Sequence, residues 1–145
     1  MTDTADAQRL ERNKRLVERL MQLLVNTETA EQARDLIDEN YIQHNPNIPD
    51  GREPILAFAA TQEGRQAKET MQVAGPALFV AEGNYVVMIQ PILRPDPCRP
   101  GETYVLSWFD MWRVEDGRVV EHWDAAEKLP WSMREKQPAA RGSNG

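Results

Sequence analysis

The sequence has a single cysteine, Cys98, and only two histidines in 145 residues. One cysteine forms no disulfide within the chain, so we expect a reducing compartment, the cytoplasm. No run of about 18 apolar residues is present and the first residues lack the apolar stretch of a signal peptide, so we expect no membrane partner. Seventeen basic against 23 acidic residues give a net charge of −6. Without a basic stripe to follow phosphates, nucleic acid is not an expected partner either.

The short motifs of several cofactor and metal classes are also missing. There is no GxxxxGK[ST], no GxGxxG after a strand, no CxxC pair and no HExxH. These absences remove the usual signals of nucleotide binding, of structural zinc and of zinc proteases. We therefore expect no cofactor and no metal, and any chemistry must come from scattered side chains.

What the sequence does contain is helical periodicity in its first half and strand periodicity in its second. Apolar spacing predicts helices over 5–26, 30–39 and 51–63, the last two opened by capping-box patterns at Thr29 and Asp50. The segment YIQHNPNIPDG is expected to be irregular because of its prolines and glycine. Strands are predicted over 69–81, 84–94, 102–114 and 118–127, with Pro91 at a bulge or an edge.

This order of elements predicts an α+β fold, in which three N-terminal helices pack against one face of a curved antiparallel sheet. We place the domain at 1–130 and expect 131–145 to be a C-terminal tail that is partly disordered.

The turn VEDGRV determines which residues of the last two strands share a face. A two-residue type I′ turn at Asp116 and Gly117 would place Asp124 level with Phe109. A three-residue turn with Gly117 as a bulge would place His122 level with Asp110, and we favour it. One face then carries Trp108, Asp110, Trp112, Val120, His122 and Asp124, and the other carries Phe109, Met111, Glu121 and Trp123.

Two polar regions are candidates for a binding site. His122 and Asp124 would be costly in a plain core, so a cavity explains them, although alternating polar residues on a strand are more often simply solvated. His44 and Asn45 lie in a stiff loop beside Tyr41, where they are either binding groups or an Asx turn before proline. The tryptophans are more often packing residues than ligand platforms.

Two stretches resemble one known family. YIQHNPNIPDGREPILAF and FDMWRVEDGRVVEHWDAAEKLP are similar to the SnoaL-like polyketide cyclase branch of the NTF2-like superfamily, in particular its predicted aldol-condensation group. The resemblance covers about residues 10 to 130. It implies a cone-shaped α+β barrel enclosing one apolar pocket, and homodimers joined through the outer face of the sheet. It also implies that Asp124 faces the pocket.

The resemblance suggests a cofactor-independent cyclase or isomerase that abstracts a proton beside the carbonyl of an apolar substrate. Asp124 would be the base, and His122 would orient it or carry the proton onward. Donors to the enolate oxygen would come from Tyr41, His44, Asn45 or Gln90. The remaining expected substrate-binding residues are Met88, Trp108, Asp110 and Trp112.

Related sequences often carry histidines in the strand where this chain has Met88 and Gln90, and the R-x-D pair of epoxide hydrolases is absent. The missing histidines favour a non-catalytic carrier of an apolar ligand as an alternative. The missing pair counts against a hydrolase mechanism that needs that arginine and a second aspartate, although an activity like that of epoxide hydrolases or dehydratases stays an alternative. A mononuclear metal site from His44, His122 and Asp124 or Asp110 is weaker, since no ligand spacing supports it.

Overall fold

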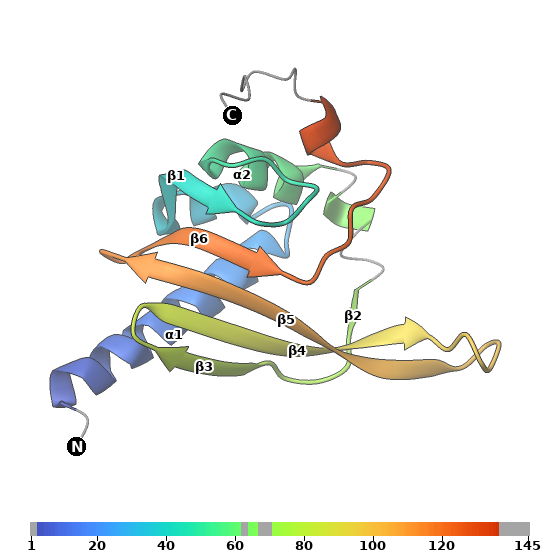
Figure 1. Cartoon of the computed structure of the whole chain (residues 1–145), viewed down its shortest axis with the longest axis horizontal. Helices are drawn as coiled ribbons and strands as arrows, with labels where there is room; N and C mark the ends of the chain where they lie inside the picture. Colours follow the sequence, from blue (N-terminus) through green and yellow to red (C-terminus); the bar gives the residue numbers. More distant parts are fainter. Residues whose placement is uncertain (1–2, 62–63, 67–70, 137–145) are drawn as a thin grey trace, which may run out of the picture.

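The computed structural model describes residues 3–61, 64–66 and 71–136 of the chain, and its elements follow the α+β order (Figure 1). The helical elements are α1 (Thr4–Leu24), a 3₁₀-helix η1 (Ala30–Leu36), α2 (Arg52–Ala60) and a C-terminal 3₁₀-turn η2 (Met133–Lys136). The strands are β1 (Ile37–Gln43), β2 (Gln72–Val73), β3 (Leu78–Glu82), β4 (Tyr85–Pro95), β5 (Thr103–Glu115) and β6 (Arg118–Asp124). None of the described helices is long and apolar enough to cross a bilayer.

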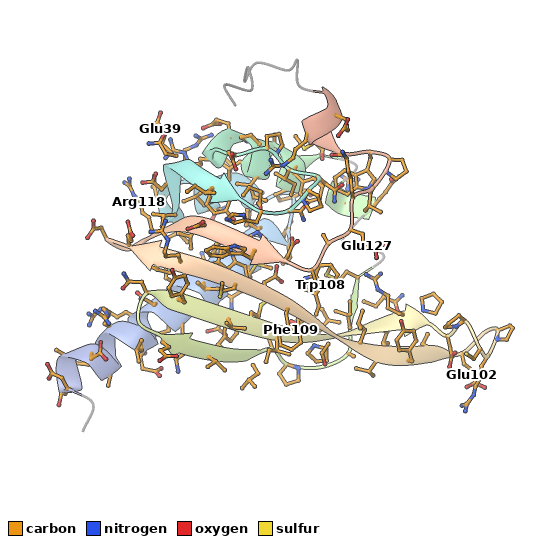
Figure 2. The ribbon with its side chains drawn as sticks, viewed as in Figure 1. Glu39, Glu102, Trp108, Phe109, Arg118 and Glu127 are labelled. Carbon is orange, nitrogen blue, oxygen red and sulfur yellow. The ribbon has the colours of Figure 1, made fainter. Side chains whose placement is uncertain are left out.

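The sheet has the strand order β1-β6-β5-β4-β2, and β3 pairs with β4 beside β2. All neighbours are antiparallel except β1, which runs parallel to β6, so the sheet is mixed and not purely antiparallel. The β4–β5 hairpin extends beyond the other strands, with Glu102 near its tip (Figures 1 and 2). Contrary to the prediction, Pro91 is neither at a bulge nor in an edge strand: it pairs with Ser107 in the unbroken register of β4 and β5, and on its other side it lies between the residues of β4 that pair with β3 and those that pair with β2.

The predicted second helix is wrong beyond Leu36, and the segment after it is not wholly irregular. The chain leaves the 3₁₀-helix at Ile37 and forms β1 up to Gln43. Ile37 and Tyr41 are both buried, and a spacing of four residues fits the helical period of 3.6 as well as the strand period of two. The apolar pattern could therefore not separate the two conformations.

Neither predicted capping box forms. The hydroxyl of Thr29 donates to the carbonyl of Leu23 at 2.9 Å instead of capping η1. Asp50 accepts from the backbone N–H of Gln43 at 2.8 Å, and Gly51 takes the position before α2 with a φ of 98°. Aspartate before glycine therefore ties the loop to β1, while glycine supplies the left-handed backbone that begins the helix.

The turn between β5 and β6 is the alternative that we did not favour. Asp116 and Gly117 both have positive φ, 49° and 74°, and Glu115 pairs with Arg118, which defines a two-residue type I′ turn. The ladder then shifts by one residue between Arg113 and Val114, at a bulge.

The shifted register corrects the predicted partners but keeps the predicted faces. His122 lies opposite Trp112, and Asp124 lies opposite Asp110. Val120 was assigned to their face, but the bulge places Val119 in the core instead, opposite Val114.

The core lies between the helices and one face of the sheet. Its residues are Val17, Leu20, Leu23, Ala33, Ile37, Tyr41, Leu56, Val86, Met88, Trp112, Val114 and Val119. We call the sheet face that carries Met88 and Trp112 the inner face, and the opposite one, which carries Phe109, the outer face. Trp108 and Phe109 are adjacent in β5, one on each face, and are labelled in Figure 2.

The segment after β6 packs back onto the loop that follows β1. Trp131 stacks on Phe58 of α2 with ring centroids 5.3 Å apart. Ser132 is buried, and its hydroxyl donates to the carbonyl of Pro46 at 3.1 Å. The domain boundary at residue 130 stays a prediction. Residues 137–145 of the predicted tail, like the element ends predicted at 62–63 and 67–70, lie outside the described residues.

Candidate active site

Two carboxylates and an imidazole meet at the inner face where β5, β6 and β1 lie side by side. Asp110 and His122 are buried, and Asp124 is half-buried. Nε2 of His122 lies 2.9 Å from Oδ1 of Asp110. His122 was expected to orient Asp124, but its carboxylate partner is Asp110, because the shifted register places both acids beside the imidazole.

The other ring nitrogen of His122 contacts β1. Its Nδ1 lies 2.7 Å from Oε1 of Gln43, and the same oxygen accepts the backbone N–H of Asn45 at 3.0 Å. The imidazole is also held between rings: the centroid of Trp112 lies 5.1 Å away, and Tyr41 stacks at 6.5 Å. Both ring nitrogens of His122 therefore have a polar partner, and two aromatic rings pack near the imidazole.

Asp124 is held by a different set of donors. Its Oδ2 accepts the side-chain amide of Asn45 at 2.6 Å, and its Oδ1 accepts the backbone N–H of Ala126 at 3.0 Å. Asn45 also forms the expected Asx turn, since its Oδ1 accepts the backbone N–H of Asn47 at 2.8 Å. The Asx turn is therefore formed, and it places the amide group that donates to Asp124; that Asn45 also binds a substrate stays a prediction.

Burial dominates the electrostatics of this site. It raises the pKa of Asp110, against the hydrogen bond and the charge of His122, and repulsion from Asp124 raises it further. Burial also raises the pKa of Tyr41, and the charges of Asp110 and Asp124 add to that effect. Tyr41 therefore keeps its proton and can act only as a neutral hydroxyl.

Other expected site residues lie on the inner face near this group. Met88 pairs with Asp110 across β4 and β5 and belongs to the core, as does Trp112. Trp108 is half-buried and donates a hydrogen bond that lowers the pKa of Asp110.

Two expected donors are not available. His44 lies on the outer face, 42% exposed, where Nε2 contacts Glu121 at 2.8 Å and the ring stacks on Trp123 at 4.7 Å. It points outward because neighbouring residues at the end of a strand alternate between faces. The amide of Gln90 donates to the carbonyls of Gly75 and Pro91 at 2.8 and 3.2 Å.

The sequence reasoning missed Gln43 and the residues that hold its loop. The guanidinium of Arg134 donates to the carbonyls of Gln43, Asn45 and Ile48, with Nε 2.8 Å from the last. The only sequence signal for Gln43 is that it lies two residues after Tyr41, and therefore on the same face. Nothing in the sequence indicates the contacts of Arg134, since backbone carbonyls carry no residue identity.

Of the residues expected for a metal site, His44 lies away on the outer face, whereas Asp110, His122 and Asp124 lie together on the inner face. One ligand atom each from Asp110, His122 and Asp124 lie within 4.8 Å of one another. In the structure, Nε2 of His122 and Oδ1 of Asp110 are within hydrogen-bond distance of each other, at 2.9 Å.

The sequence matches a family model, described as the SnoaL-like domain, over residues 17–122. The match includes β1, Asp110 and His122 and covers most of the chain, and it ends two residues before Asp124. The chain belongs to the SnoaL-like family. No curated protein matches it.

Solved structures show that this SnoaL-like chain has the NTF2-like fold. An NTF2-like protein from Burkholderia xenovorans LB400 is similar with a TM-score of 0.57 and 15% identity, over 79% of this chain and 88% of that one. An NTF2-like protein with a cystatin-like fold from Novosphingobium aromaticivorans has a TM-score of 0.51 and 22% identity, over 86% and 90% of the two chains.

A third similar structure is IdmH from Streptomyces antibioticus, a proposed polyketide cyclase. It has a TM-score of 0.51 and 21% identity, over 77% of this chain and 89% of that one. The resemblance and the fold predicted from the sequence are confirmed, although the sheet is curved and unclosed and not a complete barrel.

Proposed function

We propose that this SnoaL-like protein is an acid–base enzyme that removes a proton beside the carbonyl of an apolar small molecule, leading to aldol-type ring closure or isomerisation. One observation carries the proposal: two carboxylates face each other across β5 and β6 in different environments. Acid and base roles need such a difference, because one group must give up a proton while the other takes one.

Asp124 is the base in this proposal. It is half-buried, so a substrate carbon can approach it, and its two oxygens accept the side-chain N–H of Asn45 and the backbone N–H of Ala126. Asn45 and Ala126 fix its orientation, which is the part that we had expected of His122.

Asp110 and His122 are the acid. A carboxyl whose pKa is raised by burial holds a proton more readily, and His122 shares that proton through Nε2. When Asp124 removes the carbon-bound proton, the enolate oxygen takes a proton from this pair or a hydrogen bond from Tyr41. The pair recovers its proton from Asp124 or from solvent at the end of the cycle.

The test compares wild-type protein with Asp124→Asn on panels of aromatic polyketides, steroids and terpene epoxides, with products identified by mass spectrometry. The wild type is expected to convert a carbonyl compound, and Asp124→Asn is expected to lose turnover while keeping its fold. Asp116→Asn is the matched control, because it makes the same change at an exposed turn that tolerates asparagine. Equal rates for Asp124→Asn and wild type would refute the assignment.

The same panel separates the other functions. Tight binding without any product would favour the non-catalytic carrier, and hydrolysis of an epoxide would favour the hydrolase alternative. A cytoplasmic location stays a prediction from the single cysteine.

We also propose that two copies meet through the outer face. An apolar patch crosses four strands there, formed by Leu78, Val80, Val87, Ile89, Phe109, Met111 and Trp123, which pair with one another from strand to strand. We call this the outer patch. Leu78, Val80 and Phe109 are each at least half exposed, at 59%, 51% and 50%. Contiguous exposed apolar surface of this kind marks association sites.

A further inference from the structure

Gln43 ends β1 with its side chain on the inner face, only 2% exposed. Its Oε1 accepts two hydrogen bonds, from the backbone N–H of Asn45 and from Nδ1 of His122. We propose that Gln43 is a positioning residue that fixes the tautomer of His122, so that the ring carries a proton on Nδ1 and turns Nε2 toward Asp110.

The orientation of the Gln43 amide follows from Asn45. A backbone N–H can only donate, so the atom of Gln43 that faces it must be the carbonyl oxygen. The nitrogen Nε2 of Gln43 is buried and makes no well-formed hydrogen bond among the described residues, although the Gln43 side chain is close enough to Tyr41 to lower the pKa of that hydroxyl against the effect of burial. An unpaired buried N–H is unfavourable, yet rotating the amide would place two donors against the N–H of Asn45 and would lose both bonds to the oxygen. The oxygen therefore stays in place.

The fixed oxygen determines which nitrogen of His122 is protonated. An oxygen acceptor 2.7 Å from Nδ1 requires a proton on that nitrogen, because two lone pairs at this distance repel each other. In the other neutral tautomer, the lone pair of Nδ1 would face Oε1 of Gln43. A single amide contact from β1 thus selects the tautomer.

Selecting the tautomer leaves Nε2 and Asp110 with one proton between them. Their 2.9 Å contact is a hydrogen bond either with a protonated Asp110 and a neutral ring or with an ionised Asp110 and an imidazolium. Both arrangements hold the same number of protons. Without Gln43, the proton of the neutral ring could move from Nδ1 to Nε2 and hydrogen-bond to an ionised Asp110. The additional proton that Nε2 and Asp110 otherwise share would then be absent.

Among the described residues, no lysine or arginine makes a hydrogen bond or ion pair with Asp110 or Asp124. The proton held by the His122–Asp110 pair keeps that pair neutral, so Asp124 does not face a second negative charge. The catalytic consequence rests on the proposed function, whereas the tautomer itself does not.

The experiment is ¹⁵N NMR of protein labelled at histidine. The chain has two histidines, so His44→Gln leaves His122 as the only imidazole and makes the assignment direct. We expect Nδ1 of His122 to give the signal of a protonated ring nitrogen near neutral pH. A signal showing that Nε2 alone is protonated would overturn the proposal, and this readout needs no further substitution at the site.

Two substitutions of Gln43 extend the test. Gln43→Leu removes the acceptor and should transfer the ring proton from Nδ1 to Nε2. Gln43→Glu keeps an oxygen facing both donors and should retain the Nδ1 proton. An unchanged signal in a folded Gln43→Leu variant would contradict the role of Gln43.

Turnover provides a separate readout. We expect Gln43→Leu to lower kcat by about 10-fold, less than the roughly 10²–10⁴-fold that acid–base catalysis contributes in total, with little change in KM. Gln43→Glu should restore part of the lost kcat. If NMR shows the expected tautomer but Asp124→Asn remains active, the proposed function fails and this inference stands. If NMR shows the other tautomer and Asp124→Asn is inactive, this inference fails and the proposed function stands.

Discussion

The two histidines of the chain are in similar contacts with opposite surroundings. His44 on the outer face and His122 on the inner face each contact a carboxylate, at 2.8 and 2.9 Å, and each packs against a tryptophan. The side chain of His44 is 42% exposed, whereas that of His122 is 9% exposed.

The acids that they contact differ in the direction of their pKa shift. Partial burial would raise the pKa of Glu121, but hydrogen bonds from His44 and Arg113 outweigh it and lower the pKa. Asp110 has one imidazole and faces a second carboxylate, so burial wins and its pKa is raised. A histidine beside a carboxylate therefore belongs to an ion-pair network at Glu121 on the surface, whereas at Asp110 it adjoins a buried carboxyl that holds its proton more readily.

The largest expected difference between the two histidines is in turnover. His122→Asn should lower kcat by roughly 10²–10⁴-fold, since it removes the partner of the proposed acid. His44→Asn, the matched control, should leave kcat unchanged because that ring lies outside the site. Steady-state kinetics on the substrate found by the panel would check both, and equal losses would remove the functional distinction between the faces.

The next effect concerns assembly through the outer face. Phe109→Asp places a charge in the centre of the outer patch and should dissociate a dimer, because a buried unpaired charge is costly. Leu129→Asp makes a comparable change at an exposed site after β6 and should leave the dimer intact. Analytical ultracentrifugation measures both. A wild-type monomer would refute the dimer proposal outright.

Arg134 lets the support of the inner face be tested from outside the residues that match the family model. Arg134→Ala leaves the carbonyls of Gln43, Asn45 and Ile48 without this donor, and should lower the unfolding free energy by about 1–3 kcal/mol. It should also lower kcat, because this loop carries Asn45. Arg99→Ala, at the exposed hairpin tip, is the control. Denaturant unfolding that shows the same stability for both variants would contradict the supporting role.

The smallest effect is the pH dependence of stability, which should have opposite signs at the two acids. The folded-state pKa of Asp110 is raised, so ionisation lowers stability as pH rises above the unfolded value of about 3.9, and Asp110→Asn should gain stability relative to wild type toward neutral pH. The folded-state pKa of Glu121 is lowered, so its contribution is present above about pH 4.3 and lost as pH falls through the folded value.

Glu121→Gln should therefore be less stable than wild type at neutral pH, with the difference shrinking in acid. Thermal unfolding between pH 4 and 8 measures both variants. A loss of stability that is equal for the two variants at every pH would contradict the assigned directions.

The sequence predicted the inner face of β5 and β6 correctly although its turn was wrong. The true turn moves the register by one residue, and the bulge before Glu121 moves it by one more. Because side chains alternate with a period of two, two single shifts return Asp110, His122 and Asp124 to the same face. The strand period alone was therefore enough to bring the three residues together, but not to pair them.

Contacts between distant segments were beyond the sequence signal. The i, i+4 spacing of Ile37 and Tyr41 did not distinguish a strand from a helix, so β1 and the inward direction of Gln43 were missed. The support from Arg134 was missed because it acts on backbone carbonyls. His44 was placed with Asn45 because they are adjacent in sequence, whereas adjacency at a strand end puts the two side chains on opposite faces.

The division of labour between Asp110 and Asp124 is the central claim, and the titration of Asp110 tests it most directly. In protein labelled with ¹³C at the aspartate carboxyls, Asp110→Asn identifies the signal of Asp110 by its loss. We predict that this signal titrates at a pH above the ordinary range of an aspartate, in wild-type protein and without substrate. A signal that titrates at or below the ordinary value would contradict the account, because burial would then not raise the pKa of Asp110 above that of an ordinary aspartate.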